Sequence, residues 1–267
     1  MFNRPTFAQR LALRWLKLPY FPFQKRVIRK LLFNKLVILP INEILLECTM
    51  GDYISDHLLA NGIYEPLSIK MANNLLSQKD VFVDVGANIG LYTIILGIQQ
   101  KCHVVAFEPN QATFEILRRN IALNGLEGNS TIIPCALSDQ AGLVPIYLAD
   151  PKNIGGSSMT GGGTLVNFAP AITLASALGS LGCEFIKLLK IDVEGAEALV
   201  LSGVDLRKVE VIIVEWHGLS KKSVAKEFLA TTLYKDTFSE FNAFDVTGNP
   251  ADEVEFFIES NVLLKKK

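Results

Sequence analysis

The sequence has few of the features that mark metal-binding, secreted or membrane-spanning proteins. Its 267 residues include four cysteines, and no two of them have the CxxC spacing of a metal or redox site. The largely apolar neighbours of Cys48, Cys102, Cys135 and Cys183 predict thiols in the core. No apolar run reaches the roughly 18 residues of a membrane-spanning helix, and Arg10, Arg14 and Lys17 interrupt the stretch that a signal peptide would need. We therefore expect a cytoplasmic protein.

Acidic residues are missing from the first 42 positions, which carry nine lysines and arginines. The rest of the chain holds 17 basic and 27 acidic residues. We expect residues 1–60 to form a basic, amphipathic, helical N-terminal extension and residues 61–267 to form the main domain. Two alternatives stay open for the extension. It packs on the main domain or on a second subunit, or residues 4–35 lie peripherally on the inner, anionic membrane surface.

Nucleic acid is not an expected partner. The main domain is acidic, and the sequence contains no helix-turn-helix or RNA-binding signature.

From residue 81 onward, apolar strand-like runs alternate with amphipathic helix-like segments. The expected strands are 81–85, 103–107, 131–135, 143–148, 187–192, 209–216, 241–246 and 254–258. The expected helices are 89–99, 111–124, 221–234 and one that includes 197–201, after shorter helices and turns over 51–78. This alternation predicts an α/β fold with an open, mostly parallel sheet and helices on both faces.

Residues 154–163 contain five glycines, which predicts a flexible loop. The loop is either a plain surface connection or a lid over an active site, because lids are often built in this way.

Polar side chains collect where the expected strands end, and ligands of parallel α/β sheets bind at those carboxyl ends. Any one of these acids alone could cap a helix, but together they indicate a site. The candidates are Asp84, Gly86, Asn88, Gly90, Glu108, Asp139, Asp192, Glu194, Glu215 and His217.

The spacing around the glycine turn points to one kind of ligand. A dinucleotide site would read GxGxxG, whereas residues 86–90 read Gly-Ala-Asn-Ile-Gly and follow Asp84. A carboxylate there repels a pyrophosphate and favours an ammonium or sulfonium group. Glu108, at the end of the second strand, is suited to accept hydrogen bonds from both hydroxyls of a ribose. S-adenosylmethionine combines a ribose, no phosphate and a cationic amino-acid tail.

Three blocks of the sequence resemble the FkbM-type S-adenosylmethionine-dependent methyltransferases. They are Val83-Asp-Val-Gly-Ala-Asn-Ile-Gly90, Phe107-Glu-Pro-Asn110 and Leu189-Lys-Ile-Asp-Val-Glu-Gly-Ala-Glu197. Tyr64-Glu-Pro66 and Ile213-Val-Glu215 also fit. Many methyltransferases share the first block. The third block, at its distance from the first, is highly specific for the FkbM-type family. The resemblance covers roughly residues 62–258.

The resemblance implies a seven-stranded, Rossmann-like methyltransferase sheet and transfer of a methyl group to a hydroxyl of a saccharide or related small molecule. The residues that it assigns to the methyl donor are Asp84, Gly86, Asn88 and Gly90 around the methionine, Glu108 on the ribose and Asp139 at the adenine. Asp192 and Glu194 are implied to lie beside the sulfonium and the acceptor.

An alcohol acceptor loses its proton during the transfer, so the site needs a general base. His217 is the first candidate, with Glu215 as its orienting partner. The alternatives are that His217 is an exposed turn residue and that Asp192 or Glu194 is the base. No spacing among the acids demands a metal ion. Two competing functions are a non-catalytic nucleoside-binding scaffold of the same fold and a nicotinamide-dependent oxidoreductase, which the glycine spacing disfavours.

Overall fold

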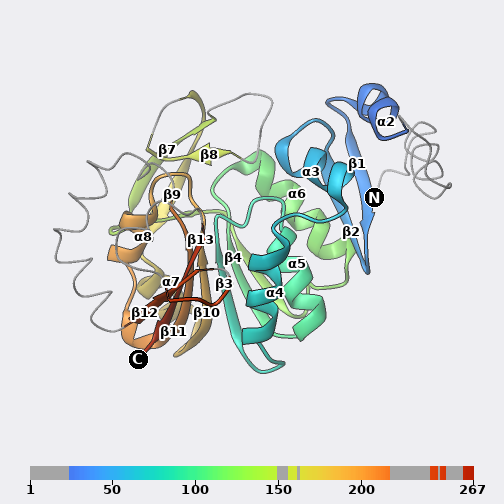
Figure 1. Cartoon of the computed structure of the whole chain (residues 1–267). Helices are drawn as coiled ribbons and strands as arrows, with labels where there is room; N and C mark the ends of the chain where they lie inside the picture. Colours follow the sequence, from blue (N-terminus) through green and yellow to red (C-terminus); the bar gives the residue numbers. More distant parts are fainter. Residues whose placement is uncertain (1–23, 149–155, 161–162, 217–240, 246, 251–260) are drawn as a thin grey trace.

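A computed structural model of the chain describes residues 24–148, 156–160, 163–216, 241–245, 247–250 and 261–267 (Figure 1). A seven-stranded sheet lies at the centre of the molecule. In the order in which they lie side by side, its strands are β12 (Phe241–Phe244), β13 (Asn261–Lys266), β11 (Val209–Glu215), β10 (Ile186–Ile191), β3 (Val81–Val85), β4 (His103–Phe107) and β5 (Ser130–Ile133).

The sheet is mostly parallel, as the sequence predicts. The pairs β11–β10, β10–β3, β3–β4 and β4–β5 are parallel, and β13 is antiparallel to both of its neighbours. The chain winds outward from β3 to β5 and then returns to place β10 on the other side of β3. Such a reversal opens a crevice at the carboxyl ends of the two central strands. The last described strand is β13, and the expected strand 254–258 and the expected helix 221–234 lie outside the described residues.

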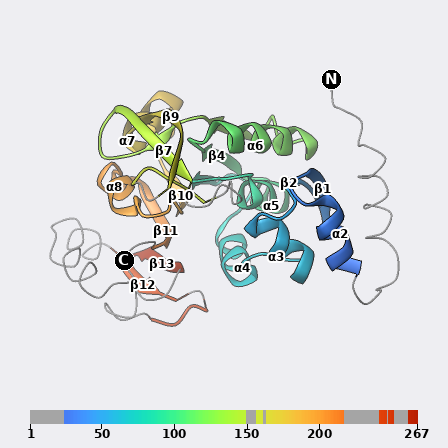
Figure 2. The ribbon, with the colours of Figure 1, turned by 90° about the horizontal axis from the view of Figure 1, so that it is seen from above.

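Helices cover both faces of this sheet, and Figures 1 and 2 show the two layers. On one face lie α4 (Pro66–Leu75), α5 (Leu91–Gln100) and α6 (Gln111–Leu123), and on the other lie α7 (Leu174–Leu181) and α8 (Glu197–Ser202). Successive side chains of a strand point to opposite faces. Phe82 and Val104 therefore pack in the core on the side of α4 to α6, while Val83, Val105 and Ile191 pack with α7 and α8. The two apolar layers fix the strand ends that form the site.

The N-terminal region is only partly helical. Helix α2 (Gln24–Leu32) matches the expected amphipathic segment, and its Ile28 and Leu32 are buried in the same core as α5 and α6. The next residues form an antiparallel hairpin, β1 (Leu36–Ile41) and β2 (Ile44–Thr49), which corrects the expectation of a wholly helical extension. Alternating burial along both strands and Asn42, with φ 51° in the turn, explain the hairpin.

Side-chain hydrogen bonds tie this hairpin to the main domain. Asn120 of α6 accepts a hydrogen bond from the Glu47 amide at 2.6 Å and donates one to the Glu47 carbonyl at 2.9 Å. Helix α3 (Tyr53–Asn61) follows the hairpin and ends at the proposed domain boundary between residues 60 and 61. The described part of the extension thus packs on the main domain, and residues 1–23 lie outside the described residues.

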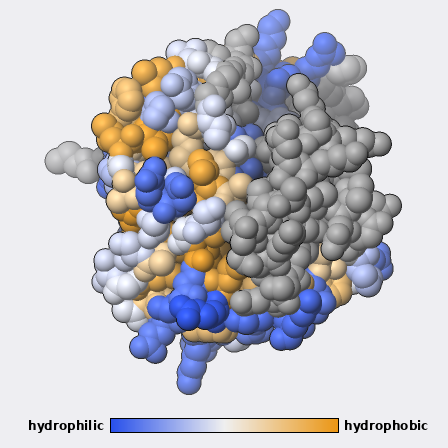
Figure 3. Space-filling view, turned by 90° about the vertical axis from the view of Figure 1, so that its left-hand side faces the viewer, coloured by the Kyte–Doolittle hydropathy of each residue, from blue (hydrophilic) through white to orange (hydrophobic). Residues whose placement is uncertain are grey.

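A second sheet of four strands lies beside the carboxyl ends of the central strands. Its order is β6 (Ala136–Leu137), β9 (Thr164–Ile172), β7 (Gly142–Leu148) and β8 (Ser157–Ser158). Part of the glycine-rich stretch 154–163, which was predicted to be a loop, forms strand β8. Ser157 and Ser158 pair there with β7. Figure 3 shows apolar residues gathered on this side of the molecule, where Leu143 and Phe168 are exposed.

Cys48, Cys102 and Cys135 are buried and Cys183 is half-buried, all as free thiols, which confirms core positions for three of them. No helix in the described part of the chain is long and apolar enough to cross a membrane.

Candidate active site

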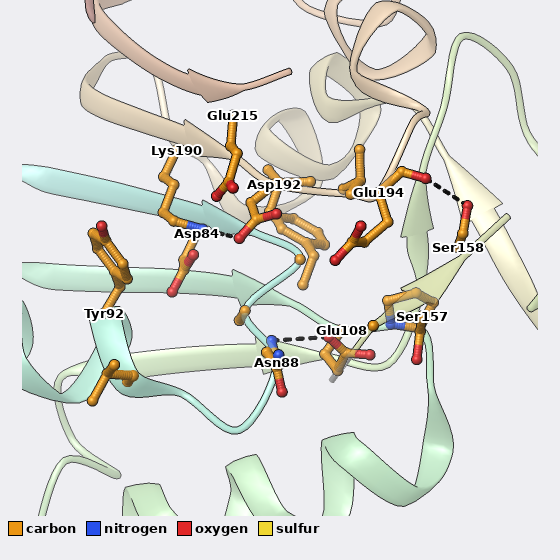
Figure 4. A pocket seen from close by; sticks show the side chains of 18 of the residues that line it. Asp84, Asn88, Tyr92, Glu108, Ser157, Ser158, Lys190, Asp192, Glu194 and Glu215 are labelled. Carbon is orange, nitrogen blue, oxygen red and sulfur yellow. Dashed lines mark hydrogen bonds and ion pairs between the residues drawn. The ribbon is translucent and has the colours of Figure 1, made fainter. Parts of the chain in front are cut away.

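A cavity of about 580 Å³ opens at the carboxyl ends of β3, β4, β10 and β11. It reaches from the glycine turn after β3 to α3 and β8. Figure 4 shows that the labelled acids point into it from two sides, with Lys190, Asp192, Glu194 and Glu215 facing Asn88 and Glu108.

The turn between β3 and α5 has a backbone that requires glycine at one point. Gly86 has φ +77°, and a Cβ atom there would lie 1.8 Å from the carbonyl oxygen of Asp192. Its amide and that of Ala87 donate hydrogen bonds to the Phe107 carbonyl, at 3.0 and 2.9 Å. The turn is therefore held between the ends of β4 and β10, and its backbone lines the cavity.

Glu108 is held by the backbone on both of its carboxylate oxygens. Oε2 accepts a hydrogen bond from the Asn88 amide and Oε1 accepts one from the Asn110 amide, each at 2.9 Å. The residue is 4% exposed, and burial raises its pKa to about 7 against the lowering effect of these two amides. Each carboxylate oxygen has a second lone pair, so the group can accept two further hydrogen bonds from a ligand.

Asp84 is buried under the glycine turn and keeps one oxygen without a partner. Its Oδ2 accepts a hydrogen bond from Thr93 Oγ1 at 2.6 Å, and Oδ1 has no hydrogen-bond partner among the described residues. Burial raises the pKa of Asp84, while the charge of Lys190 lowers it. Asp84 lines the cavity, and its unpartnered oxygen is a buried polar atom that favours a cationic or hydrogen-bond-donating ligand nearby.

Lys190 is a buried cation near the carboxyl end of strand β10. Its Nζ donates to Asp192 Oδ2 at 2.9 Å and lies 4.8 Å from the centre of the Tyr92 ring. Burial lowers the pKa of Lys190, but the charges of Asp192, Asp84 and Glu65 raise it above its usual range. The residue is therefore a fixed ammonium that balances part of the negative charge of Asp192, Glu194 and Glu215, which form the acidic wall of the cavity.

Glu65 adds a further acid from the turn before α4. Its backbone is in the left-handed region, with φ 43°, and its Oε2 accepts a hydrogen bond from the Tyr92 hydroxyl at 2.6 Å. Asn88 and Glu194, which also line the cavity, both have φ 54°. Left-handed residues other than glycine carry strain that often collects at functional sites. Three of the six left-handed non-glycine residues in the described part of the chain thus line this cavity.

Residues 156–159 close one side of the cavity. Asn110 Nδ2 donates to Ser157 Oγ at 2.8 Å, and Ser158 Oγ donates to the Glu194 carbonyl at 2.7 Å. Strand β8 is therefore connected to the ends of both β4 and β10. This placement favours the lid interpretation over a plain surface loop.

The predicted site residues fall into three groups. Those that line the cavity are Asp84, Gly86, Asn88, Glu108, Asp192, Glu194 and Glu215. Two others lie outside the lining: Gly90 has its Cα against Leu117 of α6, and Asp139 is exposed and accepts a hydrogen bond from Ser138 at 3.0 Å. His217 lies outside the described residues, so its role as a base stays a prediction.

Some lining residues were not predicted. Lys190 carried a signal, since it is the one charge in the otherwise apolar run 188–191, and a charge there is unusual in a buried strand. Glu65 stands in a matched motif but was given no role. Tyr53, His57 and Tyr92 carried no signal, because only the packing of α3 and α5 brings them to the cavity.

Comparison with known families agrees with the site. The model of the methyltransferase FkbM domain matches residues 84–244, which is more than half of the chain. The chain belongs to the FkbM methyltransferase family. The matched region begins in β3, includes the acids at the ends of β4, β10 and β11, and ends in β12.

Three curated relatives illustrate the family. Methyltransferase sdnD of Sordaria araneosa is 30% identical over 175 residues, which cover 51% of this chain and 65% of the relative. The 31-O-demethyl-FK506 methyltransferase FkbM of Streptomyces tacrolimicus is 28% identical over 178 residues, covering 54% and 68%. Hexuronic acid methyltransferase AglP of Haloferax volcanii is 33% identical over 159 residues, covering 56% and 61%. The chain thus spans about two thirds of the length of these relatives.

The residues of the cavity fit S-adenosylmethionine as the methyl donor. Glu108 offers two acceptor oxygens to the ribose hydroxyls, and the carboxylate of Asp84 lies buried beneath the glycine turn with one oxygen unpartnered, where a nearby cationic amino group is favoured. Among the described residues, no group of three or more histidines, cysteines and acids has the arrangement of a metal site.

Proposed function

We propose that the protein transfers a methyl group from S-adenosylmethionine to a hydroxyl of a saccharide or a related small molecule. The observation that carries the proposal is the row of carboxylates from Asp192, Glu194 and Glu215, which faces Glu108 across the cavity (Figure 4). A carboxylate only accepts hydrogen bonds, so this wall suits an acceptor that brings hydroxyl donors. The names of two relatives agree, since one specifies 31-O-demethyl-FK506 and the other a hexuronic acid.

S-adenosylmethionine, when bound, supplies a methyl carbon that its sulfonium has already activated. The chain has to place the acceptor oxygen in line and receive its proton, and orientation alone can supply effective molarities of about 10⁵ to 10⁸ M. We assign the proton to the carboxylate of Asp192. Lys190 holds this carboxylate at 2.9 Å and, as a fixed ammonium, orients it without competing for the proton.

The lid supports this chemistry by limiting water. Residues 156–159 lie against the cavity, and their contacts with Asn110 and Glu194 fix them to both strand ends. Exclusion of water strengthens the hydrogen bonds between acceptor and carboxylates.

A screen with a ¹³C-labelled methyl donor tests the proposed reaction. Purified full-length protein is incubated with labelled S-adenosylmethionine and a set of nucleotide sugars and glycolipid precursors, and the products are examined by NMR. We expect a new methyl resonance at the position typical of a methyl ether. Labelled methyl groups on nitrogen, sulfur or carbon alone would refute O-methylation.

The base is identified by comparing Asp192→Asn, Glu194→Gln and His217→Ala. General-base catalysis contributes about 10²- to 10⁴-fold, so we expect Asp192→Asn to lower kcat by that factor. Its affinity for S-adenosylhomocysteine should change only a few-fold, and His217→Ala should keep its turnover. Loss of kcat in His217→Ala with normal turnover in Asp192→Asn would transfer the role of base to His217.

A further inference from the structure

Three aromatic residues that line the cavity take no part in donor binding or in proton transfer. Tyr53 and His57 lie one turn apart on α3, and Tyr64 lies in the turn before α4. The ring centres are 4.4 Å apart for Tyr53 and His57, 5.8 Å for His57 and Tyr64, and 6.1 Å for Tyr53 and Tyr64. All three residues line the same cavity as Glu108.

The cluster leaves aromatic surface uncovered. Tyr53 is 56% exposed, and His57 and Tyr64 are half-buried. Large aromatic side chains gain free energy when such surface is covered by an apolar partner. An exposed tyrosine that contacts two other rings beside a cavity is therefore suited to bind a ligand.

The aromatic cluster continues into the acidic wall. Tyr64 lines the cavity together with Glu65, Asp192 and Glu215. Burial and then the charges of Glu65, Glu215 and Asp192 raise the pKa of Tyr64. The rings of the cluster and the carboxylates at the ends of β10 and β11 thus adjoin within one cavity. A ligand between them would meet aromatic faces on one side and hydrogen-bond acceptors on the other.

We propose that Tyr53, His57 and Tyr64 form the acceptor subsite and bind the apolar face of a saccharide ring. The C–H groups on one face of such a ring are attracted by the negative face of an aromatic ring, and its hydroxyls are donors that the carboxylates of Glu65, Asp192 and Glu215 can accept. The inference deepens the proposed function and rests on it. It assigns α3, which lies outside the matched family region, to acceptor recognition.

The chemistry of the wall distinguishes a saccharide from two simpler ligands. A phenol would stack on the rings but brings a single hydroxyl donor to several acids. A linear polyol brings many donors but presents no ring face to the aromatic cluster. Of these three ligands, the polyhydroxylated ring is the one that satisfies both parts of the subsite.

Saturation-transfer NMR on the full-length protein saturated with S-adenosylhomocysteine tests the proposal. The probes are methyl glycosides of hexoses at tens of millimolar, with sorbitol and phenol as comparisons. We expect transfer to the ring C–H protons of at least one glycoside and several-fold weaker transfer to sorbitol. Absence of transfer to every glycoside, or binding of phenol alone, would overturn the proposal.

Variants of the exposed tyrosine locate the contact. Tyr53→Ala should weaken glycoside binding by about two- to tenfold, because an aromatic contact is worth about 0.5–1.5 kcal/mol. Tyr53→Phe keeps the ring and should bind within about twofold of the wild type. Tyr147→Ala, which removes a half-buried tyrosine outside the cavity, is the matched control. Equal glycoside binding by Tyr53→Ala and the wild type would refute the subsite.

Calorimetry with S-adenosylhomocysteine separates the two proposals. If the wild type fails to bind it, the proposed methyltransferase function itself fails. If all variants bind it normally while Tyr53→Ala alone loses the glycoside, both proposals stand. If S-adenosylhomocysteine and the glycosides bind normally to Tyr53→Ala, only the subsite is wrong.

Discussion

Replacing Lys190 by methionine tests whether the acidic wall depends on one buried cation. Among the described residues that line the cavity, Lys190 is the only lysine or arginine, and its side chain is 4% exposed. Methionine keeps much of the side-chain volume and removes the charge. Removal of one partner of a buried ion pair costs about 3–5 kcal/mol, because the remaining charge is left uncompensated. We expect a loss of this size in the free energy of unfolding at pH 8.

The loss should depend on pH through Asp84. Burial raises the pKa of Asp84 and Lys190 opposes that effect, so the variant raises this pKa further. A carboxyl whose folded pKa is raised binds more protons when folded, and it therefore reduces stability as pH rises above its unfolded pKa. At pH 5 the variant gains more than the wild type from protonation of Asp84 in the folded state, so the difference between them should be smaller than at pH 8.

Urea unfolding of both proteins at pH 5 and pH 8 measures these quantities. Lys187→Met on the same strand is the matched control, because Lys187 forms a partly exposed pair with Glu210. Such pairs contribute about 1 kcal/mol or less. Equal losses in the two variants, or a Lys190→Met loss that does not grow with pH, would refute this account of the wall.

Three further predictions concern the donor site and the N-terminal segment. The pKa of about 7 at Glu108 implies that affinity for S-adenosylhomocysteine falls about tenfold from pH 8 to pH 6, since a neutral carboxyl loses an acceptor. Calorimetry measures this slope, and Glu108→Gln should show none. Gly86→Ala should destabilise the protein by at least about 2 kcal/mol more than Gly125→Ala in urea unfolding. Both glycines have positive φ, but only at Gly86 would a Cβ meet backbone. In liposome flotation with anionic vesicles, we expect higher recovery of the full-length protein than of a chain that starts at residue 24, which keeps the packed helix α2 and strand β1. Equal recovery would exclude membrane contact through residues 4–23.

The central sheet could be predicted because its strands follow simple local rules. Buried parallel strands read as short apolar runs, and the expected strands 81–85 and 103–107 match β3 and β4 residue for residue. The glycine turn and the acids at the strand ends follow from the same topology. These features depend on residues close together in the sequence, so a single sequence reveals them.

The remaining parts depend on contacts between distant segments. Hairpin β1–β2 forms against α6 through Asn120 and Glu47, which are 73 residues apart. Tyr53 and His57 reach the cavity only because α3 packs there, and no local pattern distinguishes them from surface residues. Gly90 and Asp139 lie outside the cavity lining, and a Cβ at Gly90 would meet Leu117 of α6. Their assigned contacts with the methyl donor stay predictions.

The most direct test of the account is a pair of calorimetric titrations of the full-length wild type at pH 8, one with S-adenosylhomocysteine and one with NAD. We expect one S-adenosylhomocysteine bound per chain and no binding of NAD. We also expect that Glu108→Ala weakens S-adenosylhomocysteine strongly, whereas Glu115→Ala, at an exposed position on α6, leaves it unchanged. Binding of NAD without S-adenosylhomocysteine, or equal affinity in Glu108→Ala and the wild type, would contradict the assignment of this cavity to the methyl donor.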